Sequence, residues 1–162
     1  MFIMKSFILW VSLLLFGGCS LKQYEVTEPK VIVLKTPKIK FADTGYVRST
    51  DNSVEIELFT AGQAVGKIAI NHLVCVEGEG CLSKGSFNES YLNKAYPDTI
   101  MQHILLGKPI FNAQHLQRSD EGFEQRIQNK AVNIIYRVDA NQIYFKDKQN
   151  RILIKIKTIP GQ

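Results

Sequence analysis

Strict alternation of apolar and polar side chains in the last third of the chain is the feature that most limits its fold. Three runs have an apolar residue at every second position: Val132, Ile134, Tyr136 and Val138; Ile143 and Phe145; Ile152, Ile154 and Ile156. A period of two residues places these side chains on one face of a strand. Polar segments at 139–142 and 147–150 separate the runs, so the sequence predicts a three-stranded antiparallel meander.

Strand patterns also fill the first half of the chain. Residues 31–34 form an apolar run that is mostly β-branched and residues 38–48 alternate, which predicts two strands or one bent strand. Residues 53–60 and 63–71 alternate around Ala61-Gly62 and predict a hairpin. Extended chain over 73–76 then leads into a glycine-containing loop.

Helical signals are confined to the middle of the chain. Ser86 and Glu89 have capping-box spacing, which predicts a short helix over residues 87–94. A second helix is predicted with Pro97 in its first turn and Gly107 as its stop. Its apolar stripe consists of Ile100, Met101, Ile104 and Leu105. We expect both helices to cover one open end of the sheet.

The polar stretch over residues 114–128 is typical of a loop, with a helical turn near 123–127. Taken together, the patterns predict an α+β fold that is mainly antiparallel β, with two short helices in the middle. They leave a sandwich and a half-open barrel as alternatives. A chain of 162 residues with 45% hydrophobic residues suits one domain, which we place at residues 31–159.

The first 18 residues have the three-part order of an export signal. Lys5 supplies a positive charge, an apolar run covers residues 7–16, and Gly17 and Gly18 precede Cys19. As a helix the run would measure about 15 Å, against about 30 Å for the hydrocarbon core of a bilayer. It is therefore too short for a comfortable transmembrane anchor.

The segment Leu-Phe-Gly-Gly-Cys at residues 15–19 resembles the bacterial lipobox, with Phe16 in place of the usual leucine. The resemblance implies a diacylglyceryl group on the Cys19 sulfur, cleavage before Cys19, and acylation of the new amine, with palmitate among the expected chains. Two or three acyl chains hold a protein on its membrane permanently. The alternative is an ordinary secretory leader, with Cys19 an unmodified residue.

The lipobox resemblance implies a signal peptide at 1–18 and a lipidated cysteine at 19. Residues 20–30 have no sustained periodicity and contain Pro29, so they predict a tether that completes the region 19–30 before the globular domain. In the enterobacterial sorting rule an aspartate after the cysteine retains a lipoprotein in the inner membrane, and Ser20 occupies that position. The outer membrane is therefore expected. The whole pattern also resembles outer-membrane lipoproteins of Helicobacter and Campylobacter relatives, which implies no established activity.

Cys75 and Cys81 are the two cysteines that remain after lipidation. In an oxidising compartment this even pair predicts a disulfide that closes a small loop, with free or buried thiols as the alternative. A redox role would lack the Cys-x-x-Cys motif. A metal site would recruit His72 and both cysteines, with Glu77 or Glu79, but the spacing matches no zinc pattern. We predict neither a metal nor a cofactor.

Catalytic motifs are not evident. His72, His103 and His115 are dispersed and lie in no nucleophile or metalloprotease motif. Glu55 and Glu57 share one strand face at a spacing of about 7 Å, a distance compatible with paired-carboxylate catalysis. Alternating exposed acids are common on strands, so a solvated surface is the simpler interpretation. We predict that the chain is not an enzyme.

The chain is mildly basic, with 20 Lys and Arg against 15 Asp and Glu and a formal net charge of +5. The cations are scattered along the sequence, and no arginine-rich helix or RNA-binding motif accompanies them. Because basicity indicates nucleic-acid binding only when it is focused, we predict no nucleic-acid partner. A solvated surface that tolerates anionic lipid headgroups is expected instead.

These expectations describe a non-catalytic envelope lipoprotein, lipid-anchored in the outer membrane, that binds or assembles with another envelope protein. The candidate docking surface is the sheet or the cap formed by Ile100, Met101, Ile104 and Leu105. A carrier for a small hydrophobic ligand, held between sheet and helices, is the alternative. A cell-wall hydrolase would need converging titratable groups, which the sequence does not foreshadow.

Overall fold

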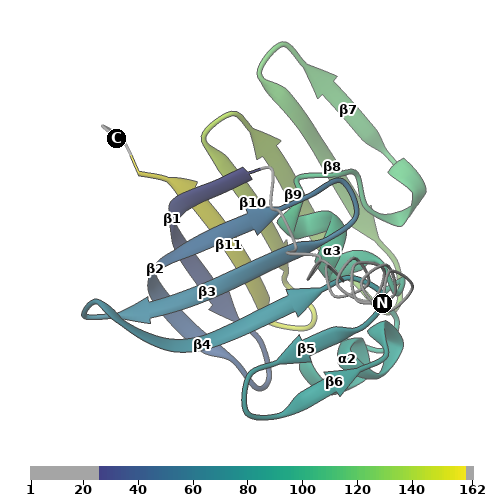
Figure 1. The fold of residues 1–162 in the computed structure, drawn as a ribbon. Helices are drawn as coiled ribbons and strands as arrows, with labels where there is room; N and C mark the ends of the chain where they lie inside the picture. Colours follow the sequence, from purple (N-terminus) through teal and green to yellow (C-terminus); the bar gives the residue numbers. More distant parts are fainter. Residues whose placement is uncertain (1–25, 160–162) are drawn as a thin grey trace, which may run out of the picture.

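The structure is a computed structural model and describes residues 26–159. These residues form one sheet of 11 strands and two short α-helices (Figure 1). The strands are β1 (Val26–Lys35), β2 (Lys40–Ser49), β3 (Val54–Thr60), β4 (Gln63–Ile70), β5 (Val74–Val76), β6 (Gly80–Leu82), β7 (Leu116–Ser119), β8 (Gly122–Gln128), β9 (Asn133–Asp139), β10 (Gln142–Asp147) and β11 (Ile152–Thr158). The helices are α2 (Lys84–Tyr91) and α3 (Ile100–Leu105), followed by a 3-10 turn, η1 (Phe111–Ala113).

The sheet consists of two meanders that meet at the ends of the described chain. Strands β1–β6 pair in sequence order, and so do β7–β11. The two halves are joined by antiparallel pairing of β1 with β11, in which Ile32 lies opposite Ile156 and Leu34 opposite Ile154. Strands from the two ends of the described chain therefore lie side by side in the middle of the sheet.

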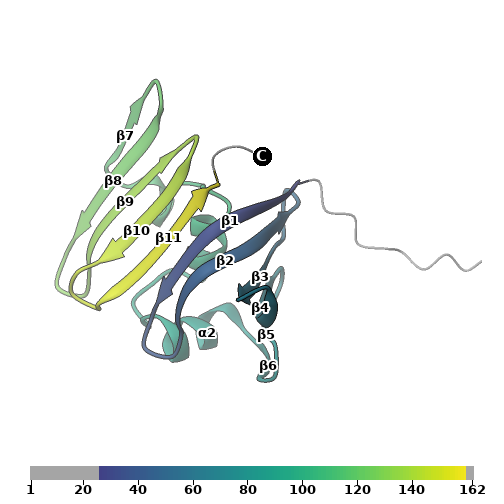
Figure 2. The same ribbon diagram turned by 90° about the vertical axis from the view of Figure 1, so that its left-hand side faces the viewer.

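The core lies on one side of the sheet. The apolar positions of the alternating strands face this side, and α2 and α3 cover it (Figure 1). The largest fully buried side chains are Tyr91, Tyr136, Phe87, Phe145, Ile32, Leu34, Ile56, Ile68, Ile70, Ile100, Ile104 and Ile110. On the other side of the sheet, which faces outward, no helix of residues 26–159 lies (Figure 2).

The structure confirms the predicted fold class. The C-terminal meander forms as β9, β10 and β11, and the predicted hairpin forms as β3 and β4. Ala61 and Gly62 turn this hairpin with φ of 50° and 79°, the left-handed values that a tight two-residue turn requires. Of the two architectures left open, the two-sheet sandwich is wrong, because the structure has one open sheet with β6 and β7 at its edges.

The boundary between tether and domain was placed too late. Strand β1 begins at Val26, so residues 26–30 pair with β2 rather than belonging to a tether that ends at residue 30. Pro29 lies within this strand, opposite Tyr46. The proline suggested a tether because it cannot donate a ladder hydrogen bond. Residues 1–25, with the expected signal peptide and Cys19, lie outside the described residues.

A hairpin replaces the loop and helical turn predicted within residues 114–128. Strands β7 and β8 form there. Gly122 starts β8 close to β9, where a side chain would not fit, because a Cβ on Gly122 would lie 1.9 Å from the carbonyl oxygen of Val138. The pattern was obscured by Gln125, a polar residue at a fully buried position of β8. Its amide accepts from Ile110 N (2.8 Å) and donates to the carbonyls of Ile110 (3.0 Å) and Gln114 (2.7 Å).

Both predicted helices form, with shifted starts. Helix α2 begins at Lys84, because the hydroxyl of Ser83 rather than Ser86 caps it by accepting from Ser86 N at 3.1 Å. Helix α3 begins at Ile100, and Pro97 lies in the preceding turn, where its carbonyl accepts from Ile100 N at 2.9 Å. Gly107 follows α3 with φ of 63°, in agreement with its predicted role as the stop.

A buried carboxylate connects the segment between α2 and α3 to the end of β10. Asp147 is fully buried and accepts five hydrogen bonds, from Tyr96 Oη, Asn150 Nδ2 and the backbone N–H groups of Asn133, Gln149 and Asn150. Burial alone would raise the pKa of Asp147, but the hydrogen bonds from Asn150, Tyr96 and the backbone favour the anion more strongly. The pKa of Asp147 is therefore lowered.

Replacing Asp147 with Asn should lower the free energy of unfolding at pH 7 by about 2–4 kcal/mol, because an amide cannot accept all five hydrogen bonds. The pKa of Asp147 is lower in the folded protein than in the unfolded chain. Its contribution to the free energy of unfolding of the unsubstituted protein is therefore complete above the unfolded pKa of about 3.9, and it is lost as the pH falls through the folded pKa. Urea unfolding at pH 7 and pH 3 measures both effects. Tyr96→Phe, which removes one hydrogen bond, should cost only about 1 kcal/mol. Equal stability of parent and Asp147→Asn at pH 7 would contradict this account.

Candidate functional site

Five lysines gather on the outward side of the central strands, which lie side by side in Figure 2. This group, called here the basic face, consists of Lys35 of β1, Lys40 of β2, Lys146 of β10, and Lys155 and Lys157 of β11. Each occupies the strand position that alternates with the buried apolar residues, so its side chain faces away from the core. Their positions in the sequence span more than a hundred residues, and the sheet brings them together.

The strand register places these lysines in adjacent cross-strand rows. Lys40 lies opposite Lys35, which lies opposite Leu153, and Leu153 lies opposite Lys146. In the next row, Lys155 lies between Val33 of β1 and Tyr144 of β10. Lys157 follows in a third row, opposite Val31. Apolar and aromatic side chains thus separate the cations, and Val31 is 40% exposed.

Three acidic residues of the outward side, Glu55, Glu57 and Glu124, lie on flanking strands and have cationic partners, and Asp139 at the end of β9 accepts a hydrogen bond from Asn141 N. Glu55 and Glu57 both contact Arg48 Nη1, at 3.3 Å and 2.7 Å. Lys67 contacts Glu55 at 3.4 Å. These two carboxylates, weighed above as a catalytic pair, thus take part in a surface ion-pair network.

The opposite flank is similar, since Glu124 contacts Arg126 at 2.5 Å and Arg137 at 2.7 Å. Within residues 26–159, none of the ion pairs found includes a lysine of the basic face. The five charges remain uncompensated at the centre of the sheet, in a chain whose formal net charge is +5.

This arrangement works against stability. Like charges directly opposite each other on neighbouring strands repel, and Lys35 and Lys40 are such a pair. A group of like charges without a stabilising partner in the fold is typical of a binding surface, because natural proteins trade stability for function at their sites. The basic face is therefore the candidate functional site.

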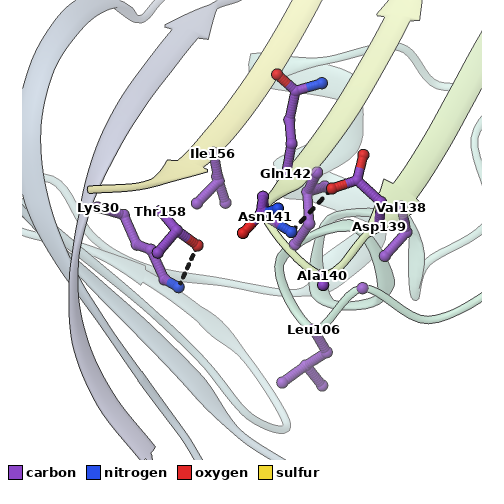
Figure 3. A pocket seen from close by; sticks show the side chains of 11 residues that line it. Lys30, Leu106, Val138, Asp139, Ala140, Asn141, Gln142, Ile156 and Thr158 are labelled. Carbon is purple, nitrogen blue, oxygen red and sulfur yellow. Dashed lines mark hydrogen bonds between the residues drawn. The ribbon is translucent and has the colours of Figure 1, made fainter. Parts of the chain in front are cut away.

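A small cavity opens on the core side of the sheet, between α3 and the β9–β10 turn (Figure 3). Its volume is about 220 Å³, and it is lined by Lys30, Leu106, Gly107, Val138, Asp139, Ala140, Asn141, Gln142, Ile143, Ile156 and Thr158. Ligand pockets usually enclose roughly 300–1,000 Å³. Within its lining, Lys30 Nζ donates to Thr158 Oγ1 at 3.1 Å, so part of the wall that an apolar ligand would contact is polar.

The stripe that was expected to dock a partner is part of the core. Ile100, Met101, Ile104 and Leu105 are 0–3% exposed, because α3 packs its apolar face against the inner side of the sheet. An amphipathic pattern in sequence identifies the buried face of a helix but does not show what covers it. The prediction that these four side chains form a docking cap is therefore wrong.

The structure confirms a disulfide between Cys75 and Cys81, which lie opposite each other in the β5–β6 hairpin. The bond takes both sulfurs out of the metal site weighed above, and residues 26–159 contain no cluster of three or more His, Cys, Asp or Glu side chains that could hold a metal. The same hairpin contacts α2, where the Tyr91 hydroxyl donates to Glu79. This hydrogen bond, with burial and the nearby negative charge, raises the pKa of Tyr91 to about 12.

The three histidines stay apart in the fold. Nδ1 of His103, on α3, lies 2.7 Å from the carbonyl oxygen of Pro109. His72 lies in the turn between β4 and β5, and His115 lies just before β7. The structure brings no pair of them together as a catalytic unit.

The basic face could not be recognised from the spacing of the lysines along the chain, because they lie on four strands from both halves of the sequence. One signal was available: Lys155 and Lys157 occupy the polar positions of an alternating run and must share a face. Because β11 pairs with both β1 and β10, their face continues onto the neighbouring strands.

None of the helices within residues 26–159 is long and apolar enough to cross a membrane. Comparisons with family models, curated proteins and solved structures found no match for this chain.

Lys35→Glu should raise the free energy of unfolding by about 0.5 kcal/mol, because it converts a repulsive cross-strand pair with Lys40 into an attractive one. Thermal unfolding measures the change. The matched control is Lys94→Glu, which makes the same charge change at an exposed position between α2 and α3 and should have little effect. A Lys35→Glu variant less stable than the control would show that the lysine supports the fold.

Proposed function

We propose that this chain is a lipid-anchored envelope lipoprotein whose domain is a non-catalytic module that binds the anionic headgroup surface of its membrane. The observation that carries the proposal is the basic face, with five uncompensated lysines interleaved with apolar side chains on one outward surface. Lysines next to an anionic leaflet contribute about 1 kcal/mol each. Five of them suffice to orient a domain that an anchor already holds at the surface.

The expected anchor lies close in sequence to this face. Residues 20–25 separate Cys19 from the first residue of β1, and a chain of this length reaches at most about 25 Å. Strand β1 is itself one of the four strands that carry the basic face. A lipid on Cys19 therefore holds the face within reach of the headgroups.

The chemistry of the face supports binding rather than catalysis. General acid–base catalysis pairs groups whose environments push their pKa values apart. The basic face offers amines of one type, separated by aliphatic and aromatic side chains. Lysine side chains of this kind place their methylene groups along apolar surface and their amines toward phosphate.

Lipidation should be visible in the intact mass of the protein extracted from membranes. We expect a chain that begins at Cys19, carries acyl groups, and is two hydrogens lighter than its reduced form because of the Cys75–Cys81 disulfide. Cys19→Ala removes the acceptor sulfur and should abolish acylation. A native product with an uncut leader, or with an unmodified Cys19 thiol, would contradict the anchor.

Contact between the basic face and lipid should protect its lysines from an amine-reactive reagent. We expect Lys155 and Lys157 of the full acylated chain to be labelled several-fold more slowly on vesicles of phosphatidylcholine with phosphatidylglycerol than on phosphatidylcholine alone. Peptide mass spectrometry measures each site. High salt should remove the difference, because the attraction is screened.

Lys94 and Lys130 serve as internal controls in the same sample, because both are exposed and lie off the basic face. Their labelling should be alike on the two kinds of vesicle. Equal labelling of Lys155 and Lys157 on both vesicles would overturn the proposal. If Lys155 and Lys157 are protected only in cells, and only where an envelope protein can be crosslinked to the chain, the basic face binds a protein partner instead.

A further inference from the structure

A second hollow lies at one end of the basic face. It has a volume of about 470 Å³ and is lined by Lys35, Thr36, Lys40, Phe41, Ala42 and Arg151. It forms where the β1–β2 turn and the β10–β11 turn reach the same end of the sheet, as the pairing of Lys35 with Leu153 requires and as Figure 2 shows. Its volume falls within the usual range for ligand pockets.

Three cations line this hollow, and none of its lining residues is acidic. Lys35 and Lys40 come from the paired ends of β1 and β2, and Arg151 comes from the other turn. Without a bound anion, the repulsion between these like charges is unfavourable. An anion between them would relieve it, and a phosphate accepts hydrogen bonds from both guanidinium and ammonium groups.

Both turns that carry these cations are held by hydrogen bonds. In the β1–β2 turn, Thr36 N donates to Ile39 O at 2.8 Å, and Ile39 N donates to Thr36 Oγ1 at 3.0 Å. In the β10–β11 turn, Asp147 Oδ1 accepts from the N–H groups of Gln149 and Asn150 just before Arg151. The cations thus project from fixed backbone, which lowers the entropy cost of binding.

The remaining lining is apolar enough to favour an amphiphile over a free ion. Ala42 is exposed on the same side of β2 as Lys40, opposite Val33 of β1. Phe41 points to the other side of the strand, where it packs against the hydrophobic core beneath the hollow. Carbon atoms next to a bound phosphate would cover Ala42. Cations at the rim and carbon beneath them match the boundary between the headgroup and the acyl chains of a lipid.

We infer that this hollow binds one anionic phospholipid, with its phosphate between Lys35, Lys40 and Arg151 and its glycerol backbone over Ala42. The inference rests on the proposed function, because it names a lipid that the basic face would engage. It adds a defined stoichiometric site to a surface that otherwise attracts headgroups by charge alone.

Native mass spectrometry of the full acylated chain, released from nonionic detergent, tests the site. Phosphatidylglycerol, phosphatidylcholine and glycerol 3-phosphate are added separately at equal concentration. We expect one bound phosphatidylglycerol, with an affinity at least about tenfold above that for either other ligand.

The triple variant Lys35→Gln, Lys40→Gln, Arg151→Asn removes the three charges. Asn is chosen at Arg151 because it tolerates the left-handed backbone there, where φ is 56°. This variant should bind phosphatidylglycerol at least about tenfold more weakly. The matched control, Lys94→Gln, Arg118→Gln, Lys130→Gln, removes the same charge at exposed positions that do not line the hollow and should change affinity less than about twofold.

Four outcomes would overturn the inference: undiminished binding by the folded site variant, equal loss in the control, equal affinity for phosphatidylcholine, or equal affinity for glycerol 3-phosphate. The last would show a site for free phosphate. Because Lys155 and Lys157 remain in the site variant, the labelling experiment separates the two proposals. If they stay protected on anionic vesicles while the hollow shows no lipid preference, the basic face binds membrane without a specific lipid site.

Discussion

The pairing of β1 with β11 is the interaction on which the rest of the structure depends. It joins residues as distant as Lys30 and Thr158 and turns two independent meanders into one sheet. Without it, each half would expose a long unpaired edge, which is a template for aggregation. With it, the inward side chains of both halves form a continuous apolar floor for α2 and α3.

The same pairing creates the basic face. Lys35 and Lys40 belong to the N-terminal meander, whereas Lys146, Lys155 and Lys157 belong to the C-terminal one. On separate sheets these would be two small groups of exposed lysines, of little consequence. Side by side they form one surface of a single sign, whose repulsion the fold tolerates because the apolar contacts beneath it are extensive.

Structural features that depend on neighbouring residues could be predicted from the sequence, whereas features that depend on residues far apart in the chain could not. The β3–β4 hairpin was predictable because alternation and Ala61-Gly62 act locally. The β7–β8 hairpin was not, because the buried Gln125 breaks the apolar period and is satisfied only by Ile110 and Gln114, which the fold brings to it. The N-cap of α2 was predicted at the wrong residue for a related reason. Ser83 and Ser86 are both suitable capping residues, and only the structure shows that Ser83 has the extended backbone and the hydrogen bond of an N-cap.

The strands of the C-terminal meander, the two helices and the Cys75–Cys81 disulfide could be predicted from the sequence, because they depend on periodicity and short spacing. The polar side of each strand could be predicted for the same reason. Which strands became neighbours depended on the folded structure, and so did the burial of the apolar stripe of α3 and the gathering of scattered lysines on one face. Pairing between strands more than a hundred residues apart leaves no mark in a local pattern, because its free energy comes from contacts that exist only after the chain has closed on itself.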